Sequence, residues 1–289
     1  MGEVIYPFPE AIRKAITNHD STLNFGLWFN KFVPLENKRT SFPPADKTGE
    51  KEKRVEYYLQ EYGKYSGSEI LNRALLKKHH EQMGMCTSFS GRYFYLVITA
   101  QLSSRLITGI GESHPNEISM VFDHNLGIPY IPSSGIKGIV RFANTLTKIQ
   151  ELIQEDENCN KSDDEDEKWN IRHIFGTQKN RGKVIFLDAY PLTVPSLDMD
   201  IINPHYSKYY SEGKHPADYL EPNPIKFLTV KPGVKFAFRA LVPEDLLKET
   251  RKAYRKALLK EGVGAKTSLG YGCFSDIREE EDPDLLDHL

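Results

Sequence analysis

The chain has 289 residues, of which 39% are hydrophobic and 27% charged, a composition typical of a folded protein with a sizeable core. Its longest apolar run, residues 93–98, is far too short to span a membrane. Cys86, Cys159 and Cys273 lack CxxC spacing, which argues against a zinc ribbon or a disulfide framework and predicts a cytoplasmic protein.

Charge is distributed unevenly along the chain. Residues 155–167 carry a net charge of −7 and residues 276–289 carry −6, so the overall charge of −2 leaves +11 on the remainder. This segregation fits a basic surface for nucleic acid, and it also fits a solvated surface rich in ion pairs. Residues 155–168 hold no large apolar side chain and predict a disordered acidic insertion, and residues 279–289 predict an acidic C-terminal tail.

The first 90 residues are typical of helices and irregular segments, and they predict a helical N-terminal extension. The expected helices cover residues 9–17, residues 50–62, and a segment that Ser68 caps and that ends at Gly84. His79 and His80 are adjacent, so their side chains point in different directions on a helix. Both are therefore expected to be favourable charges at the helix C-terminus or plain surface residues, rather than a metal pair.

From Arg92 onward, β-branched and aromatic runs alternate with helical segments. The expected elements are a central strand over 93–100, a helix from about 133, a strand over 183–190, strands over 225–230 and 234–242 joined by a tight turn at Pro232-Gly233, a helix over 243–262, and a strand over 271–277. In the strand over 234–242, every second residue from Val234 is expected to face inward. Residues 191–224 predict a long loop.

This order of elements predicts an α+β fold of the ferredoxin-like (RRM-like) type, β-α-β-β-α-β, over residues 91–278. The helical N-terminal extension over residues 1–90 is expected to pack on this domain. Long loop insertions interrupt the pattern, and the loop over residues 203–210 places tyrosines beside a lysine. Exposed tyrosines can stack on bases, but the loop can equally pack on itself or form a contact surface for another protein.

The glycine-rich stretch over residues 262–272 is the first candidate site. It holds Gly262, Gly264, Gly270 and Gly272, with Lys266, Thr267 and Ser268 between them. Glycines allow close approach to the main chain, and successive exposed amides bind anions. A P-loop is disfavoured, because Ala265 stands where that motif needs glycine and because the helix precedes the loop. The alternative is a helix cap, with Gly262 at its end, followed by a turn into a strand.

A second candidate site lies at the helix that begins near residue 133. Ser133 and Ser134 are good capping residues, and the free amides of a helix N-terminus attract phosphate. Lys137 and Arg141 add positive charge nearby. An ordinary capped core helix explains the same residues.

Four segments together resemble the RAMP superfamily of CRISPR proteins. They are residues 129–141 (PYIPSSGIKGIVR), Ile174-Phe175-Gly176, residues 182–191, and the glycine-rich loop over 262–272. The loop is specific to the superfamily. Asn203-Pro204-His205-Tyr206 and residues 224–241 narrow the resemblance to the family of sixth-numbered subunits of type III-B (Cmr) effector complexes.

The resemblance covers roughly residues 92–277 and implies a cytoplasmic, non-catalytic scaffold subunit that binds CRISPR RNA near the 3′ part of the guide, in antiviral defence. It implies packing with the repeated backbone RAMP, the small helical subunit and the terminal RAMP, contact with target RNA, and no cofactor or membrane. The carried-over RNA contacts are Gly262, Gly264, Lys266, Thr267, Ser268 and Gly270, and then Ser134, Lys137 and Arg141.

Two catalytic alternatives remain open. Other RAMPs process CRISPR RNA as metal-independent endoribonucleases, which need a converging general acid and base. His114, His124 and His205 lie in loops, but no spacing brings two of them together. A metal nuclease using Asp123 with His124, or Asp198 with Asp200, is the second alternative.

Overall fold

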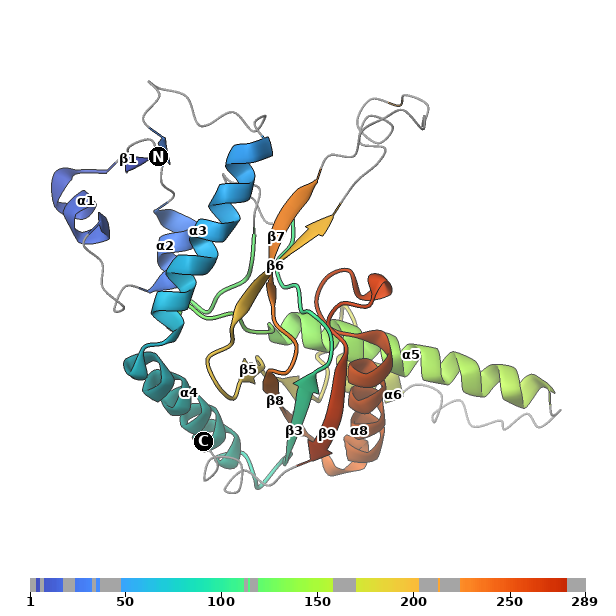
Figure 1. The fold of residues 1–289 in the computed structure, drawn as a ribbon. Helices are drawn as coiled ribbons and strands as arrows, with labels where there is room; N and C mark the ends of the chain where they lie inside the picture. The colour runs from blue at the N-terminus through green and yellow to red at the C-terminus, as the bar shows by residue number, and fades with distance from the viewer. Residues whose placement is uncertain are drawn as a thin grey trace. The chain divides into compact units, whose positions relative to one another are not determined.

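The computed structural model describes residues 4–5, 8–17, 24–32, 35–36, 48–111, 114, 119–157, 170–202, 213 and 224–279. These residues form two compact units, and Figure 1 follows them along the chain. The first unit draws on residues 1–68, 109–128 and 196–230, and the second on residues 69–108, 129–195 and 231–289. The sequence predicts a boundary after residue 90, and in the structure the division falls after residue 68. The helix over residues 69–87 groups with the second unit because it packs on the sheet of that unit.

Several expectations fall on residues outside these ranges. They concern most of the acidic insertion, the loop over 203–210 with His205, and residues 280–289. Some residues at the edges of these segments are described. Residues 155–157, expected to be disordered, belong to a helix, and Glu279, expected in the tail, belongs to a strand.

The first unit is built from short helices and two-stranded pairs. Its elements are β1 (Val4–Ile5), α1 (Glu10–Thr17), α2 (Phe25–Lys31), β2 (Leu35–Glu36), α3 (Thr48–Ser66), β6 (Leu197–Ile202) and β7 (Ile225–Val230). An aromatic cluster forms its core. The ring centroid of Phe25 in α2 lies 5.0 Å from that of Tyr62 in α3. The ring centroid of Phe29 in α2 lies 4.8 Å from that of Tyr58 in α3. Edge-to-face aromatic pairs of this kind add to the stabilisation that burial provides.

The prediction of a hairpin between the strands over residues 225–230 and 234–242 is wrong. β7 pairs antiparallel with β6, which lies in a stretch expected to be a loop. The turn at Pro232-Gly233 is held elsewhere, because the amide of Gly233 donates to the carbonyl of Leu102 at 2.7 Å. The turn therefore belongs to the end of the second unit's central strand, and not to a hairpin with β7.

The second unit contains the main sheet. Its elements are α4 (Glu69–Thr87), β3 (Phe94–Leu102), α5 (Ser133–Glu157), α6 (Asn170–Phe175), β4 (Ile185–Phe186), β5 (Tyr190–Pro191), β8 (Lys235–Val242), a 3-10 turn (Glu244–Leu246), α8 (Leu247–Lys256), a π-helical turn (Ala257–Glu261), a 3-10 turn (Thr267–Leu269) and β9 (Phe274–Glu279). The strand order is β4-β8-β3-β9, with β5 also on β8, and every pairing is antiparallel. The fold is therefore α+β, and β3 is the central strand that its sequence predicts.

The single strand expected over residues 183–190 is divided into β4 and β5. The break falls where the chain turns to meet the start of α5. Ala189 exchanges two backbone hydrogen bonds with Ile131, at 2.9 and 3.0 Å, and the carboxylate of Asp188 accepts from the amide of Ser133 at 2.6 Å. Asp188 and Ala189 are not part of the strand pairing with β8, because their hydrogen-bonding groups hold the N-terminus of α5.

Strand β8 is buried on both faces, although alternate burial was expected. All residues from Phe236 to Val242 are buried. α8 covers one face, where Tyr254 lies 5.8 Å, between ring centroids, from Phe186. α4 covers the other face, where Cys86 joins a cluster with Leu241. A strand covered on both faces has a nearly continuous apolar sequence.

One charged residue interrupts that apolar run. Arg239 is fully buried in β8, and its guanidinium donates to the hydroxyl of Tyr95 at 2.9 Å, to Nδ1 of His79 at 3.0 Å and to the amide oxygen of Gln82 at 3.1 Å. A guanidinium has only donors, so Nδ1 of His79 accepts. Nε2 then carries the proton and donates to the carbonyl of Pro191 at 2.9 Å. His79, expected at the surface, is thus a buried neutral histidine that ties α4 to the sheet.

The glycine-rich loop is anchored to the segment that follows β3. The amide of Ala265 donates to the carbonyl of Ile107 at 2.9 Å, and the amide of Gly272 donates to the carbonyl of Arg105 at 2.8 Å. A Cβ at Gly264 would collide with the carbonyl oxygen of Ile107. The glycine at position 264 is therefore needed for close packing of the loop on its own chain.

No helix among the described residues has the length and apolar character that crossing a membrane would require.

We predict that acid weakens the fold through His79. Burial, and then the nearby Arg239, lower the pKa of His79 to about 4, against an ordinary value near 6.5. A lowered folded-state pKa means that the stabilisation is complete above pH 6.5 and is lost as the pH falls toward 4. The free energy of unfolding, measured by urea titration, should drop by about 2 kcal/mol between pH 7.5 and pH 5.

His79→Gln removes this titration and should flatten the profile in that window, whatever its effect at pH 7.5. His80 is exposed, so His80→Gln is the matched control and should keep the profile of the unmodified chain. Identical profiles for His79→Gln and the unmodified chain would contradict the assignment.

We also predict that Gly264 and Gly270 differ in their tolerance of a side chain. Both have positive φ, 96° and 89°, so alanine introduces similar backbone strain at each. A Cβ at Gly270 meets open space, whereas one at Gly264 meets Ile107. Gly264→Ala should therefore lower the free energy of unfolding by roughly 1–3 kcal/mol more than Gly270→Ala in urea titrations. Equal losses would show that the loop moves freely away from residue 107.

Candidate nucleic-acid interface

The outer part of the glycine-rich loop is a tight turn over residues 266–270. Lys266 adopts the left-handed conformation, with φ 57°, and the 3-10 turn Thr267–Leu269 follows it. The amide of Leu269 donates to the carbonyl of Lys266 at 3.0 Å, and the amide of Gly270 donates to that of Thr267 at 2.9 Å. Ser268, Leu269 and Gly270 are exposed. The outer part of the turn, residues 268–270, is therefore open to solvent, and two backbone hydrogen bonds define its conformation.

Three successive amides at the start of this turn are available to a ligand. Among the described residues, the N–H groups of Lys266, Thr267 and Ser268 have no hydrogen-bond partner. A left-handed residue followed by right-handed ones forms a concave site for anions. The hydroxyls of Thr267 and Ser268 and the ammonium of Lys266 add donors of the kind that phosphate oxygens accept. The turn has the donors that a phosphate group needs.

The other two glycines of the predicted site have backbone roles. Gly262 is buried with φ 75°, and its amide donates to the carbonyl of Ala257 at 2.9 Å, which ends the π-helical turn. Gly264 packs against Ile107. Lys266, Thr267, Ser268 and Gly270 thus share one exposed turn, while Gly262 and Gly264 shape the chain that carries it.

The second predicted site falls on the first two turns of α5. Ser134 and Arg141 are exposed and Lys137 is half-buried. The spacing of three and four residues places all three on one face of the helix. The helix N-terminus already has an anionic partner, because the Asp188 carboxylate accepts from the amide of Ser133. These side chains can contact a phosphate, but the charge of the helix end is partly neutralised by the chain itself.

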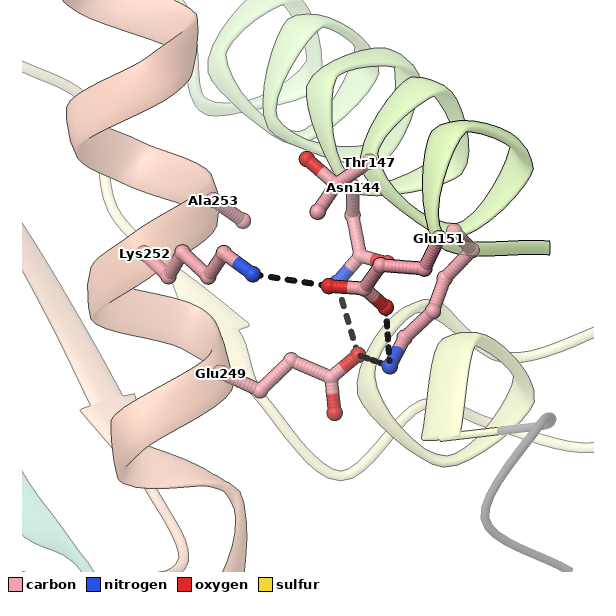
Figure 2. A pocket seen from close by; sticks show the side chains of 7 residues that line it. Asn144, Thr147, Glu151, Glu249, Lys252 and Ala253 are labelled. Atoms are coloured by element: carbon pink, nitrogen blue, oxygen red, sulfur yellow. Dashed lines mark hydrogen bonds and ion pairs between the residues drawn. The ribbon is translucent and has the colours of Figure 1, made fainter. Parts of the chain in front are cut away.

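Helices α5 and α8 lie side by side and are joined by charged side chains (Figure 2). Glu151 of α5 pairs with Lys148 at 3.3 Å and with Lys252 of α8 at 2.8 Å. The hydrogen bond from Lys252 is the main reason why the pKa of Glu151 is lowered. The cavity among these residues measures about 30 Å³, room for about one water and far too little for a nucleotide.

His114 and Asp123 each have a structural role in the first unit. Nε2 of His114 lies 2.9 Å from the carbonyl of Phe29, and the two rings stack 4.5 Å apart. Burial lowers the pKa of His114. Asp123 is buried, and its carboxylate accepts from the amides of Asn125 and Leu126, both at 2.8 Å, which closes a turn.

The remaining catalytic candidates are not gathered into a site in the part of the chain that is described. His124 is exposed beside Asp123, and His205 lies outside the described residues. Asp198 and Asp200 lie on β6, where each carboxylate accepts from the amide of the next residue at 2.9 and 2.8 Å. Within the described ranges, no three His, Cys, Asp or Glu residues are arranged to hold a metal ion.

Two groups of residues were missed from the sequence. Arg239 lies in a strand for which alternate burial was expected, and its charge within an apolar run was the available signal. The exposed cations of α8, Lys248, Lys252 and Arg255, were not among the predicted site residues. Their spacing of three and four residues, which places them on one face, was the signal for a surface.

Comparison with known proteins gives the family. The model of the RAMP superfamily matches residues 99–275. A curated relative, "CRISPR system Cmr subunit Cmr6" of Pyrococcus furiosus, is 31% identical over 86% of this chain and 82% of its own length. "CRISPR system CMR subunit Cmr6" of Saccharolobus solfataricus is 34% identical over 62% of this chain and 58% of its own length.

A solved chain has the same fold. It comes from the cryo-EM structure of the Type III-B Cmr-beta bound to cognate target RNA, with 24% identity, a TM-score of 0.55, and coverage of 93% of this chain and 87% of the other. The matched residues include all four segments on which the resemblance to the superfamily rested, residues 129–141, 174–176, 182–191 and 262–272. The chain therefore belongs to the RAMP superfamily and, within it, to the family of Cmr6 subunits of the type III-B CRISPR system.

Proposed function

We propose that this chain is a non-catalytic scaffold subunit that binds CRISPR RNA near the 3′ part of the guide in a type III-B (Cmr) effector complex for antiviral defence. The observation that carries the proposal is the exposed turn over residues 266–270. It offers three adjacent amides, two hydroxyls and an ammonium, without a carboxylate that pairs with Lys266 among the described residues. Such a site binds the phosphate backbone and does not distinguish bases.

The relatives support the assembly in which this binding occurs. Two curated Cmr6 subunits align with the chain, and a solved structure of the same fold is a Cmr complex bound to target RNA. The partners that we propose are CRISPR RNA, target RNA, the repeated backbone RAMP, the small helical subunit and the terminal RAMP. We place the subunit in the cytoplasm.

We further propose that the second unit is a ferredoxin-like (RRM-like) fold. The order β3, α5, β4, β8, α8, β9 along the chain and the antiparallel strand order β4-β8-β3-β9 support it. This assignment matters for function because it places the glycine-rich loop directly between the second helix, α8, and the last strand, β9. The sheet face that RRM proteins use for base stacking is covered here by α4, which favours the loop as the RNA contact.

A RAMP-type metal-independent endoribonuclease is the alternative function. It needs an acid and a base at the same phosphodiester. His114 is held by stacking and by the carbonyl of Phe29, and the carboxylate of Asp123 is used in a turn. These contacts favour structural roles for both residues and therefore support the scaffold proposal.

We predict that Lys266→Ala weakens binding of single-stranded RNA by about 1 kcal/mol, or roughly fivefold, with little change in melting temperature. Fluorescence anisotropy with a labelled RNA, repeated over a salt series, measures the effect. Removing one phosphate contact should lower the slope of log affinity against log salt by about 0.7. Arg73→Ala on α4, which removes an exposed cation that already pairs with Glu69 at 2.6 Å, is the control and should leave the slope unchanged. A Lys266→Ala protein with unchanged affinity and slope would contradict the proposed site.

We also predict that the purified chain leaves RNA intact. A 5′-labelled CRISPR repeat RNA is incubated with the protein, with Mg²⁺ or with EDTA, and analysed on a denaturing gel. Cleavage in EDTA that His114→Ala abolishes would establish the endoribonuclease alternative. Cleavage that occurs only with Mg²⁺ would indicate a metal nuclease instead.

A further inference from the structure

A row of cations lies along the outer face of α8. Lys248, Arg251, Lys252 and Arg255 are spaced by three and four residues, so they lie on one face of the helix over about 10 Å. Ala253 and Tyr254, on the opposite face, are buried. The side chains of Lys248, Lys252 and Arg255 are exposed. We call these four residues the α8 basic row.

Only part of this charge is neutralised by the chain itself. Arg251 contacts Glu279 and lies 5.0 Å from the ring centroid of Phe94, and Lys252 pairs with Glu151 at 2.8 Å. Among the described residues, Lys248 and Arg255 have no carboxylate partner. The half-buried Lys256 is bonded to neutral groups only, Thr147 and Gln150, each at 3.0 Å. The outer face of α8 therefore keeps an excess of positive charge.

The carboxylates nearest to this face are already used. Glu151 is shared between Lys148 and Lys252, and Glu249 accepts from Asn144 at 3.1 Å and lies 3.8 Å from Lys148 (Figure 2). These contacts join α8 to α5, and among the described residues they leave no carboxylate paired with Lys248 or Arg255. Lys248 and Arg255 thus lie on a helix that ion pairs join to α5, and they can meet an external anion without first breaking an ion pair.

We propose that the α8 basic row is a second contact for the RNA backbone, which extends the phosphate site of the glycine-rich loop along α8. The inference rests on the proposed RNA-binding function. Its basis is continuity, because α8 and the π-helical turn lead directly into Gly262, and Arg255 lies seven residues, or about 10 Å, before that glycine. One strand of RNA held at residues 266–268 passes this face within a few nucleotides. Contacts with phosphates at this row add affinity without base specificity.

An acidic protein surface is the other class of partner that this row can attract. RNA is favoured because the row ends beside a turn with free amides and hydroxyls, which are donors for phosphate oxygens. The row also contains no exposed apolar residue between positions 248 and 255, whereas stable protein interfaces have an apolar centre.

The test compares two double substitutions in the full-length chain. Lys248→Gln with Arg255→Gln removes the two unneutralised charges. Arg73→Gln with Lys77→Gln removes one arginine and one lysine of similar exposure from α4 and is the matched control. Affinity for a labelled single-stranded RNA of about 20 nucleotides is measured by anisotropy between 50 and 300 mM salt, together with the melting temperature of each variant.

We expect the α8 double variant to keep its melting temperature, because the altered side chains are exposed. Its affinity should fall about tenfold at 150 mM salt, and its salt slope should fall by roughly 1.4, or 0.7 for each lost contact. A five-nucleotide RNA, long enough for the loop alone, should show little difference between this variant and the control. If both double variants bind the long RNA equally while Lys266→Ala weakens it, the row is not an RNA contact and the loop site stands.

Two other results are decisive. If Lys266→Ala and the α8 variant both bind RNA as the unmodified chain does, the proposed function fails together with this inference. If the α8 variant binds RNA normally but no longer co-purifies with the other subunits of the complex, the row binds an acidic protein surface, and the RNA assignment is overturned.

Discussion

The two backbone hydrogen bonds that join the glycine-rich loop to residues 105 and 107 are the contacts on which the candidate site depends. Arg105 and Ile107 follow directly after β3, so the loop is attached to the central strand of the sheet. Gly264 permits this attachment because no Cβ separates it from the carbonyl of Ile107. The exposed turn at residues 266–270 is therefore attached to the second unit by backbone hydrogen bonds on both sides of it. A preorganised set of donors loses less entropy on binding a ligand than a mobile loop does.

The buried guanidinium of Arg239 sets a second constraint, on the opposite side of the sheet from α8. Burying a charge is costly unless hydrogen bonds satisfy it, and Arg239 finds them in Tyr95, His79 and Gln82. Two of these partners lie on α4, so the helix must keep one register against the sheet. Buried polar networks of this kind favour one arrangement over others of similar packing. The same helix covers one face of the sheet, and the candidate phosphate-binding turn lies outside that face.

The sequence predicted most of the elements of the second unit and misplaced those that depend on distant partners. Residues 93–100, 133–143 and 243–262 have strong local patterns, and each corresponds to an observed element. The pairing of β7 with β6 was missed, because the Pro232-Gly233 turn is typical of a hairpin while the bond from Gly233 to Leu102 is invisible locally. The surface position predicted for His79 was wrong for the same reason. Its partner, Arg239, is 160 residues away along the chain.

Local sequence predicted part of the candidate site as well, and contacts between distant residues decide the rest. Glycines, a lysine and hydroxyls within eleven residues predicted a phosphate-binding loop, and the resemblance assigned it to RNA, but composition alone gave Gly262 and Gly264 the same role as Gly270. Only the fold separates them, because a Cβ at Gly264 meets Ile107 and a Cβ at Gly270 meets open space.

Net charge was equally ambiguous, since the excess of +11 outside the acidic tracts did not reveal which cations are neutralised. The ion pairs between α5 and α8 identify the neutralised cations. They occupy Lys148 and Lys252 and leave Lys248 and Arg255 facing solvent. The proposed binding of RNA would depend on this unneutralised remainder, which lies on the helix that leads into the glycine-rich loop.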